Sequence, residues 1–265
     1  MNNLESALLQ VEELALKKRK ILNTSWPQFM LRAIIASMFI GMGVVVAFTT
    51  GDLFYQVHSP WAYPLAAFTF GGAIILIAYG GGDLFTGNTF YFTYAALRKR
   101  SSWIDAIKLW LFSYTGNLIG AFLFAFLILA AGLFAHADAD SMLMVIVAKK
   151  MTAPTMELFF RGILCNWMVC LAFFIPMTQQ GDGAKMFTMM LYVFGFFISG
   201  YEHSIANMAS FAIALVSEHP DKISMAGFVH NIIPVTLGNL VGGGLFMGAV
   251  YAFINRKKSE PSPDA

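Results

Sequence analysis

The sequence predicts an all-α membrane protein with six membrane-spanning helices, arranged as two related groups of three. Three observations predict this fold class: an apolar composition, six long apolar runs, and motifs that recur in the two halves of the chain. Hydrophobic residues make up 58% of the 265 residues and charged residues 12%, and the mean hydropathy is +0.66. An average soluble domain is roughly half apolar and about a quarter charged, so this composition indicates a membrane-embedded protein.

Six apolar runs reach the length of about 20 residues that a helix needs to cross a bilayer. They cover residues 29–49, 61–97, 104–134, 155–177, 186–216 and 226–254. The second and fifth runs are too long for one span and contain glycine and polar residues near the middle. We therefore predict that helices two and five are broken, because glycine destabilises a helix interior. The stretch between the third and fourth runs is expected to be an outside loop.

The first part of the chain, residues 1–27, is predicted to form a cytoplasmic amphipathic helix. Its acidic residues come early and Lys17–Lys20 come late, which is the order that the helix dipole favours. Its apolar residues recur at helical spacing, at Leu4, Leu8, Val11, Ala15 and Leu22. Residues 28–254 are predicted to form the six-helix transmembrane domain, and residues 255–265 a disordered cytoplasmic tail. The first part has no long apolar run, so no cleavable signal peptide is expected.

Clusters of basic residues predict the orientation in the membrane. They lie before the first run, after the second and after the sixth, at Lys17–Lys20, Arg98–Arg100 and Arg256–Lys258. All three fall on the cytoplasmic side if both termini are cytoplasmic, as the positive-inside rule requires. We expect a multi-pass protein of the cell (inner or plasma) membrane, with lipid around it. The net charge of +2 is too small to suggest a nucleic-acid partner.

Related motifs recur in the two halves. T-G-N-L-I-G-A begins at Thr115 in the third run, and L-G-N-L-V-G-G begins at Leu237 in the sixth. A weaker match joins L-R-A-I-I-A-S-M from Leu31 to F-R-G-I-L-C-N-W from Phe160. Such a 3+3 inverted repeat places the functional site near the midplane, at the interrupted helices. Close helix packing is predicted at four glycines, with two asparagines bridging helices by hydrogen bonds: Gly116, Gly120, Gly238, Gly242, Asn117 and Asn239.

The two breaks contain the unusual residues of the chain. The first reads Y-G-G-G-D-L-F-T-G-N-T over Tyr79–Thr89, where Asn88 or Thr89 is expected to cap a new half-helix. The second reads G-Y-E-H-S-I-A-N-M over Gly200–Met208, where Asn207 is expected to cap or bridge. Irregular backbone at membrane depth persists only where it is buried in protein or lines a wet cavity.

His203 is the histidine that falls at the middle of a span. An ionisable residue inside a membrane is costly, so a functional role is its default interpretation. Asp83 and Glu202 are interpreted as structural groups that bind backbone N–H groups freed by the breaks. The other histidines are expected in solvated outer loops or at the interface: His58, His136, His219 and His230. Cys165 and Cys170 are interpreted as reduced packing residues, and no metal site or cofactor is predicted.

Four motifs then carry a resemblance to a known family. They are G-G-D-L-F-T-G-N, L-C-N-W-M-V-C-L-A, S-G-Y-E-H-S-I-A-N-M and G-N-L-V-G-G-G, in this order along most of the chain. Together they resemble the formate/nitrite transporter family. The resemblance implies a homopentamer in which each protomer has its own pore, an aquaporin-like fold, passage of small monovalent anions, and no enzymatic activity.

The resemblance also implies roles for individual residues. His203 matches the family's central pore histidine, Thr86 the threonine close to it, and Lys150 the lysine that draws in anions; Asn207 and Asn166 match two further pore residues. Two apolar constrictions are implied at Phe70, Ile74, Leu84 and Phe196, where the isoleucine is a mild departure from the family's usual leucine. Structural roles at the breaks are predicted from the residues themselves for Gly81, Gly82, Asp83, Gly200 and Glu202. Arg161 matches no site residue.

The mechanism that follows is proton-linked passage of an anion, with formate as the first candidate and nitrite or hydrosulfide as the alternatives. A bare anion crosses an apolar constriction at high cost, whereas a neutral acid crosses cheaply. A carboxyl group titrates near 4 and imidazole at about 6.5, so proton transfer from His203 is uphill by about 3–4 kcal/mol in water. Desolvation raises the proton affinity of the anion and narrows this gap.

Two other classes remain open from the sequence. An aquaporin-like channel for neutral solutes has the same architecture, but the chain lacks an Asn-Pro-Ala pair and has an ionisable group at the midplane. An intramembrane enzyme needs a metal cluster or a nucleophile with its base, and the chain contains no H-E-x-x-H motif. Water permeability without anion flux favours the first class, and metal in the purified protein favours the second.

Overall fold

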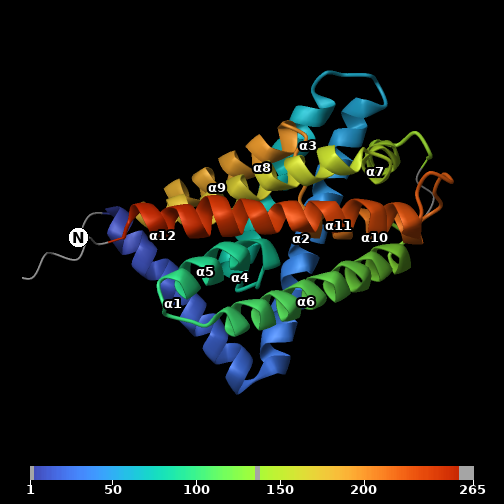
Figure 1. Cartoon of the computed structure of the whole chain (residues 1–265). Coiled ribbons are helices and arrows are strands. Elements are labelled where there is room, and N and C mark those ends of the chain that lie inside the picture. The colour runs from blue at the N-terminus through green and yellow to red at the C-terminus, as the bar shows by residue number, and fades with distance from the viewer. Residues whose placement is uncertain (1–2, 135–137, 257–265) are drawn as a thin grey trace, which may run out of the picture.

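The computed structural model describes residues 3–134 and 138–256, and every regular element in these ranges is helical (Figure 1). The first half contains α1 (Asn3–Thr24), α2 (Trp26–Tyr55), α3 (Ala62–Phe70), α4 (Gly72–Gly80), α5 (Phe85–Leu97) and α6 (Trp103–Ala130). The second half contains α7 (Met142–Met151), α8 (Thr155–Phe174), the 3₁₀ helix η1 (Ile175–Thr178), α9 (Asp182–Ile198), α10 (Ser204–Val216), α11 (Met225–Val241), the π-helix η2 (Gly242–Ala249) and α12 (Val250–Ile254).

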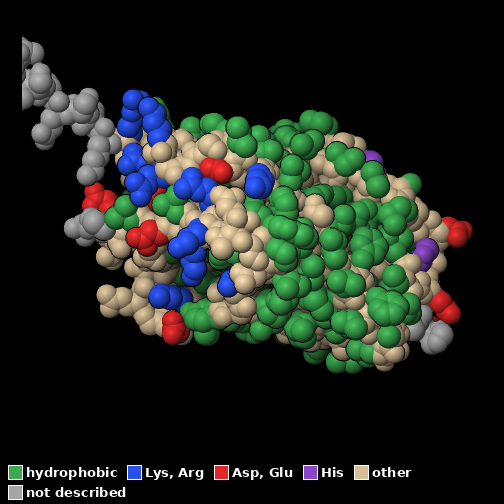
Figure 2. Space-filling model, turned by 90° about the horizontal axis from the view of Figure 1, so that it is seen from below, with side chains coloured by type: hydrophobic (Ala, Val, Ile, Leu, Met, Phe, Trp, Pro, Cys, Tyr) green, Lys and Arg blue, Asp and Glu red, His purple; other side chains and the backbone are tan. Residues whose placement is uncertain are grey.

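Several of these helices are apolar enough to cross a membrane. By length and composition, five helical stretches of the described chain qualify: Trp26–Tyr55, Ala62–Gly80, Trp103–Ala130, Thr155–Thr178 and Met225–Ile254. α10 is a shorter apolar helix. Figure 2 shows Lys and Arg side chains gathered at one end of the molecule, while hydrophobic side chains cover most of the remaining face. An apolar surface of this extent is expected of a protein surrounded by lipid or by other subunits.

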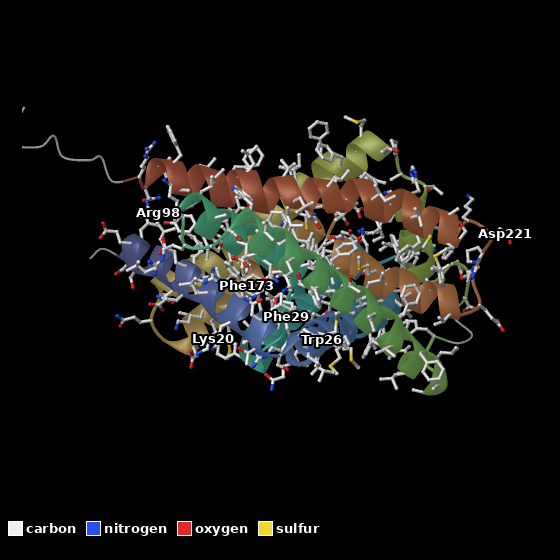
Figure 3. The ribbon with its side chains drawn as sticks, turned by 60° about the horizontal axis from the view of Figure 1, so that its bottom comes forward. Lys20, Trp26, Phe29, Arg98, Phe173 and Asp221 are labelled. Carbon is white, nitrogen blue, oxygen red and sulfur yellow. The ribbon has the colours of Figure 1, made fainter. Side chains whose placement is uncertain are left out.

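Helix α1 packs its apolar stripe against the end of the molecule at which α5 ends and α6 begins. Its buried residues include four of the five that the sequence pattern selected: Leu8, Val11, Ala15 and Leu22. Glu12, which is also buried, forms ion pairs with Arg98 and Arg100, and Arg19 pairs with Asp105. Figure 3 shows Arg98 and Lys20 at this end and Asp221 at the opposite end. The helix is therefore docked by both apolar and ionic contacts.

The chain leaves helical geometry at both expected breaks. Gly81, with φ +73°, follows α4, and Gly200, with φ +69°, follows α9; both backbones lie in the left-handed region that favours glycine. The capping prediction was wrong, because Asn88 and Thr89 lie inside α5. The first backbone N–H of α5 is instead bound by an asparagine side chain from another helix, as described below.

The four glycines predicted to pack closely do so. A methyl group at Gly120 would collide with the backbone carbonyl of Ile34, and one at Gly238 with that of Phe159. Close contacts at Gly116 and Gly242 likewise join α6 to α2 and the α11–η2 helix to α8. The glycines therefore set the distance between these helices.

We expect Gly238→Ala to lower the stability of the folded protein. Its new methyl group meets backbone atoms that cannot turn aside, and overpacking of this kind costs about 1–3 kcal/mol. Thermal unfolding in detergent measures the effect as a fall in Tm. Gly183→Ala is the matched control, because no atom lies within 4 Å of its added methyl group. An equal Tm for both variants would contradict the packing role of Gly238.

His136, expected in an outer loop, and residues 257–265 of the expected tail lie outside the described residues. Two features of the fold were not predicted. The segment expected to be an outside loop contains α7, which carries Lys150 on its last turn. Span six contains the π-helix η2, where Gly243 and Gly248 face Thr89 and Thr93 of α5 at close range. The absence of side chains at these two positions lets α5 pack directly on this helix.

Candidate functional site

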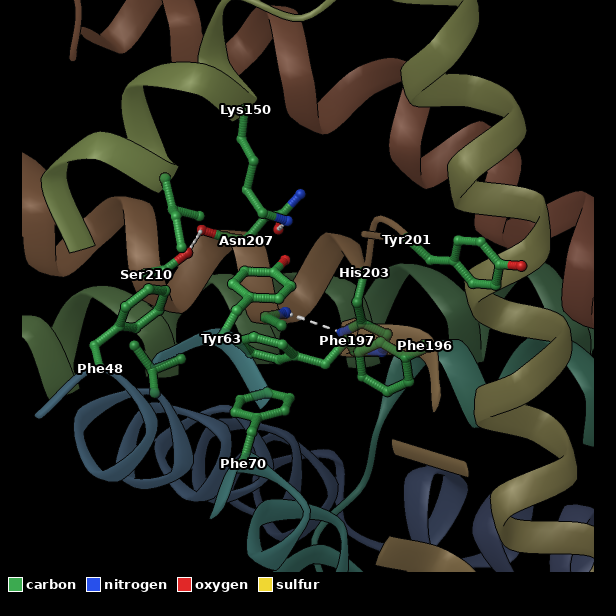
Figure 4. Close-up of a pocket in the computed structure, with 13 residues that line it drawn as sticks. Phe48, Tyr63, Phe70, Lys150, Phe196, Phe197, Tyr201, His203, Asn207 and Ser210 are labelled. Atoms are coloured by element: carbon green, nitrogen blue, oxygen red, sulfur yellow. Dashed lines mark hydrogen bonds between the residues drawn. The ribbon is translucent and has the colours of Figure 1, made fainter. Parts of the chain in front are cut away.

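Three cavities lie in sequence through the molecule. The α7 vestibule, of about 40 Å³, is lined by Lys150, Asn207, His203, Tyr63 and several aromatic residues (Figure 4). The central chamber, of about 20 Å³, is lined by apolar side chains and His203. The α1 vestibule, of about 320 Å³, opens beside α1 and contains Lys18 and Asp83. A volume near 20 Å³ holds about one water molecule, so the central chamber is the smallest of the three cavities.

Shared lining residues show that the cavities adjoin. Phe70, Phe196 and His203 line both the α7 vestibule and the central chamber. Ile77 and Leu84 line both the central chamber and the α1 vestibule. The central chamber therefore lies between the two vestibules and is separated from each of them by shared, mostly apolar side chains.

The four residues expected to form constrictions all line the central chamber. The rings of Phe70 and Phe196 meet edge to face with centroids 6.2 Å apart on the side of the α7 vestibule. Leu84 lies on the side of the α1 vestibule, and Ile74 completes the apolar wall. All four side chains are buried. A hydrated ion has to lose most of its water to enter such a space.

His203 is the polar residue of the central chamber, and the break in helix five positions it. It occupies the N-cap of α10 with extended backbone, and its Nδ1 accepts a hydrogen bond from the Ala206 N–H at 3.0 Å. Its Nε2 lies 2.9 Å from Thr86 Oγ1 at the start of α5. A backbone N–H only donates, so Nδ1 is an acceptor and a neutral ring carries its proton on Nε2. The imidazole therefore presents an N–H to Thr86, and its ring stacks on Phe196.

The α7 vestibule contains a lysine held by a carboxylate and an amide. Lys150 Nζ lies 3.0 Å from Glu202 Oε2 and 3.1 Å from Asn207 Oδ1, and Asn207 Nδ2 also donates to Glu202. Asn231 accepts a further hydrogen bond from Asn207 at 2.9 Å. The ammonium is therefore partly neutralised, fixed in place, and still in contact with the cavity.

The same arrangement of lysine, carboxylate and amide recurs in the α1 vestibule, where it was not predicted. Lys18 Nζ of α1 lies 3.3 Å from Asp83 Oδ1 and 2.7 Å from Asn88 Oδ1, and Asn88 Nδ2 donates to Asp83. The signal was present in the sequence, because each break contains an acidic residue followed five positions later by asparagine. What the sequence did not show is that the N-terminal helix supplies the lysine.

Two asparagines, one at each break, make matching sets of hydrogen bonds. Asn117 Oδ1 accepts from the N–H of Phe85, and its Nδ2 donates to the carbonyls of Ala33 and Asp83. Asn239 makes the same set of bonds to Ser204, Gly162 and Glu202. The prediction that these asparagines bridge helices is confirmed.

The two acidic residues of the breaks therefore differ from the expectation. They were expected to bind the freed backbone N–H groups, but the asparagines bind those groups instead. Asp83 and Glu202 use their carboxylates to hold Lys18 and Lys150.

Asn166 is placed behind the cavities, not on their walls. Its Nδ2 contacts the Thr86 carbonyl at 3.2 Å, Thr89 Oγ1 at 2.9 Å and the Asn239 carbonyl at 2.6 Å, and its side chain is fully buried. It therefore connects α8 to the half-helix that carries Thr86. Gly81 and Gly82 line the α1 vestibule, and Cys165 and Cys170 are free and buried as expected.

A narrow apolar passage between two cationic vestibules, within a bundle of apolar helices, defines a membrane channel. The comparisons with known proteins agree with this class. Residues 6–253 match the family described as formate/nitrite transporter. The chain belongs to the formate/nitrite transporter family, whose members are transporters and channels, not enzymes.

Two curated relatives are similar over most of their length. The chain is 60% identical over 249 residues to an uncharacterised transporter, YwcJ, of Bacillus subtilis. This match covers 94% of this chain and 97% of YwcJ. It is 35% identical over 241 residues to the nitrite transporter NirC of Escherichia coli. This match covers 89% of this chain and 87% of NirC.

Two solved structures have the same fold. A chain described as an FNT family ion channel superimposes with a TM-score of 0.89 at 31% identity, over 94% of this chain and 99% of that chain. A pentameric formate channel with formate bound superimposes with a TM-score of 0.71 at 27% identity, over 92% and 98%.

Proposed function

We propose that this protein conducts small monovalent anions across the cell membrane, with His203 as the group that hydrogen-bonds the anion in transit. The observation that supports this most directly is the central chamber, where His203 is the polar lining residue among apolar side chains. Each adjoining vestibule contains a lysine that attracts anions.

The proposed topology has six membrane crossings. α2, α6, α8 and the α11–α12 stretch each cross once, while α3–α5 and α9–α10 are the two broken crossings. The basic end, with α1 and Arg256, faces the cytoplasm, as the positive-inside rule favours. We propose a homopentamer in the cell membrane, supported by the pentameric formate channel of similar fold.

The passage of the anion has three steps. An anion entering either vestibule exchanges part of its water for the lysine ammonium and nearby amides. It then reaches the apolar chamber, where a bare charge costs several kcal/mol. There it competes with Thr86 for the hydrogen bond that neutral His203 donates from Nε2. In the proton-linked route a proton from the entry side first binds the ring, and the imidazolium transfers a proton to the anion, so the ring returns to its neutral form as the neutral acid passes the constriction. Beyond the chamber the acid releases this proton to water and becomes an anion again.

Formate is the first substrate candidate and nitrite the second. Both are small, planar, monovalent anions that fit a narrow chamber. The formate channel of similar fold supports formate, and the 35% identity to a nitrite transporter supports nitrite.

Stopped-flow flux into proteoliposomes tests the proposal with the wild-type protein. We expect formate and nitrite to enter faster than into protein-free vesicles, and flux to increase when the anion is added with an inward proton gradient. Osmotic water permeability is measured in the same vesicles. Water passage without flux of either anion would instead identify an aquaporin-like channel.

A further inference from the structure

The α1 vestibule differs from the α7 vestibule in both size and charge. Its volume of about 320 Å³ exceeds the 40 Å³ of the α7 vestibule and lies in the range of small-molecule binding sites. Four cationic residues from three helices line it: Lys17, Lys18, Arg32 and Lys185. Asp83 is the one carboxylate among its lining residues, all of which lie in the described part of the chain.

Most of this positive charge is not neutralised. Asp83 pairs with Lys18 and is shared with Asn88, so it does not offset the other three cations. Arg32 Nη1 donates to the Gly81 carbonyl, which carries no net charge. Buried Glu12 pairs with Arg98 and Arg100. Asp182 accepts a hydrogen bond from the Tyr79 hydroxyl and is not among the residues that line the vestibule.

This excess charge is more than passage of a monovalent anion requires. The α7 vestibule serves the same passage with one lysine, which Glu202 partly neutralises. The side chains that line the α1 vestibule comprise four cations and one carboxylate around a space of about 320 Å³. The next step along the passage is the central chamber of about 20 Å³, which excludes any anion that fills the vestibule.

We propose that the α1 vestibule is a binding site for a compact polyvalent organic anion, a di- or tricarboxylate that enters it and does not pass the chamber. The cations come from α1, α2 and α9 around one cavity, so a ligand with two or three carboxylates offers a partner to more than one of them. Such an anion closes the passage from this side, and this blocking effect, unlike the binding itself, rests on the proposed transport function.

Binding is tested first by thermal unfolding of the full chain in detergent, with citrate and succinate as probes and chloride at equal ionic strength as the reference. We expect a saturable rise in Tm with citrate, a smaller rise with succinate, and none with chloride. The double variant Lys17→Gln/Lys185→Gln is expected to lose the rise. Lys20→Gln is the matched control, because Lys20 is an exposed lysine of α1 that does not line the vestibule (Figure 3). The proposal is overturned if citrate acts no better than chloride, or acts equally on wild type and the double variant.

Blocking is then measured as formate flux in vesicles with citrate confined to the α1 side or to the α7 side. Citrate at about ten times its dissociation constant is expected to lower flux about tenfold from the α1 side and to have no effect from the α7 side. The ratio of flux with and without citrate is compared within each variant, so a change in basal flux does not enter. Binding without inhibition would overturn the blocking role. Citrate binding in a protein that passes no formate or nitrite would overturn the transport function and leave the binding site standing.

Discussion

His203→Asn is expected to abolish the dependence of anion flux on the proton gradient. Asparagine is a good N-cap residue, so the variant retains an acceptor for the Ala206 N–H at the start of α10 and the half-helix remains in place. What it loses is the titratable imidazole that faces Thr86 beside the chamber, because an asparagine amide donates hydrogen bonds but does not transfer a proton. A positioned proton donor contributes about a hundredfold or more, so gradient-driven flux is expected to fall by roughly that factor.

The measurement is formate flux in proteoliposomes with and without an inward proton gradient, for wild type and variant. His230→Asn is the matched control, since His230 is exposed on α11 and contacts the Ala153 carbonyl away from the cavities. Flux in His203→Asn that still rises with the gradient would exclude the histidine as the proton donor. Flux indifferent to the gradient in the wild type as well would leave a passive anion channel.

Most of the helices could be predicted from the sequence, but α7 could not. Apolar runs predicted the long helices because burial in lipid imposes a minimum length on each, and the largest difference is at α2, which continues to Tyr55 and not to residue 49. The recurring G-N motifs predicted the packing at Gly120 and Gly238, because only a residue without a side chain tolerates that distance. The π-helix η2 could not be predicted this way, since the same glycine pattern is compatible with an ordinary α-helix that packs closely on a neighbour.

The candidate site could be predicted only in part. His203 stands out because an ionisable group is costly in a membrane. Motif resemblance selected Lys150 and Thr86. Lys18 was missed because its sequence context is that of an ordinary amphipathic helix; its role depends on α1 reaching the first break. Asn166 was expected in the pore, yet its hydrogen bonds lead to helix backbones, and no pattern of residue types separates these two placements.

The second large effect is expected at the ion pair between Lys18 and Asp83. Lys18→Met leaves a nearly buried carboxylate without its cation, and breaking such a pair costs about 3–5 kcal/mol. The α1 vestibule then presents a negative charge next to Leu84, at the entrance to the chamber. Repulsion of the arriving anion is expected to lower formate flux by about tenfold or more, since local charge changes entry rates by factors of about 10–1000.

The double variant Lys18→Met/Asp83→Asn distinguishes two effects of losing Lys18: the uncompensated charge of Asp83, and the loss of the ammonium group as a binding partner for the anion. Wild type and double variant both have a neutral pair at this place, so we expect Tm and most of the flux to return. Lys150→Met and Lys150→Met/Glu202→Gln provide the same comparison in the α7 vestibule. A double variant as inactive as Lys18→Met, with Tm restored, would mean that the anion needs the ammonium group itself. In that case the two lysines act as binding groups and not only as counter-charges to the acids that the breaks bring into the membrane.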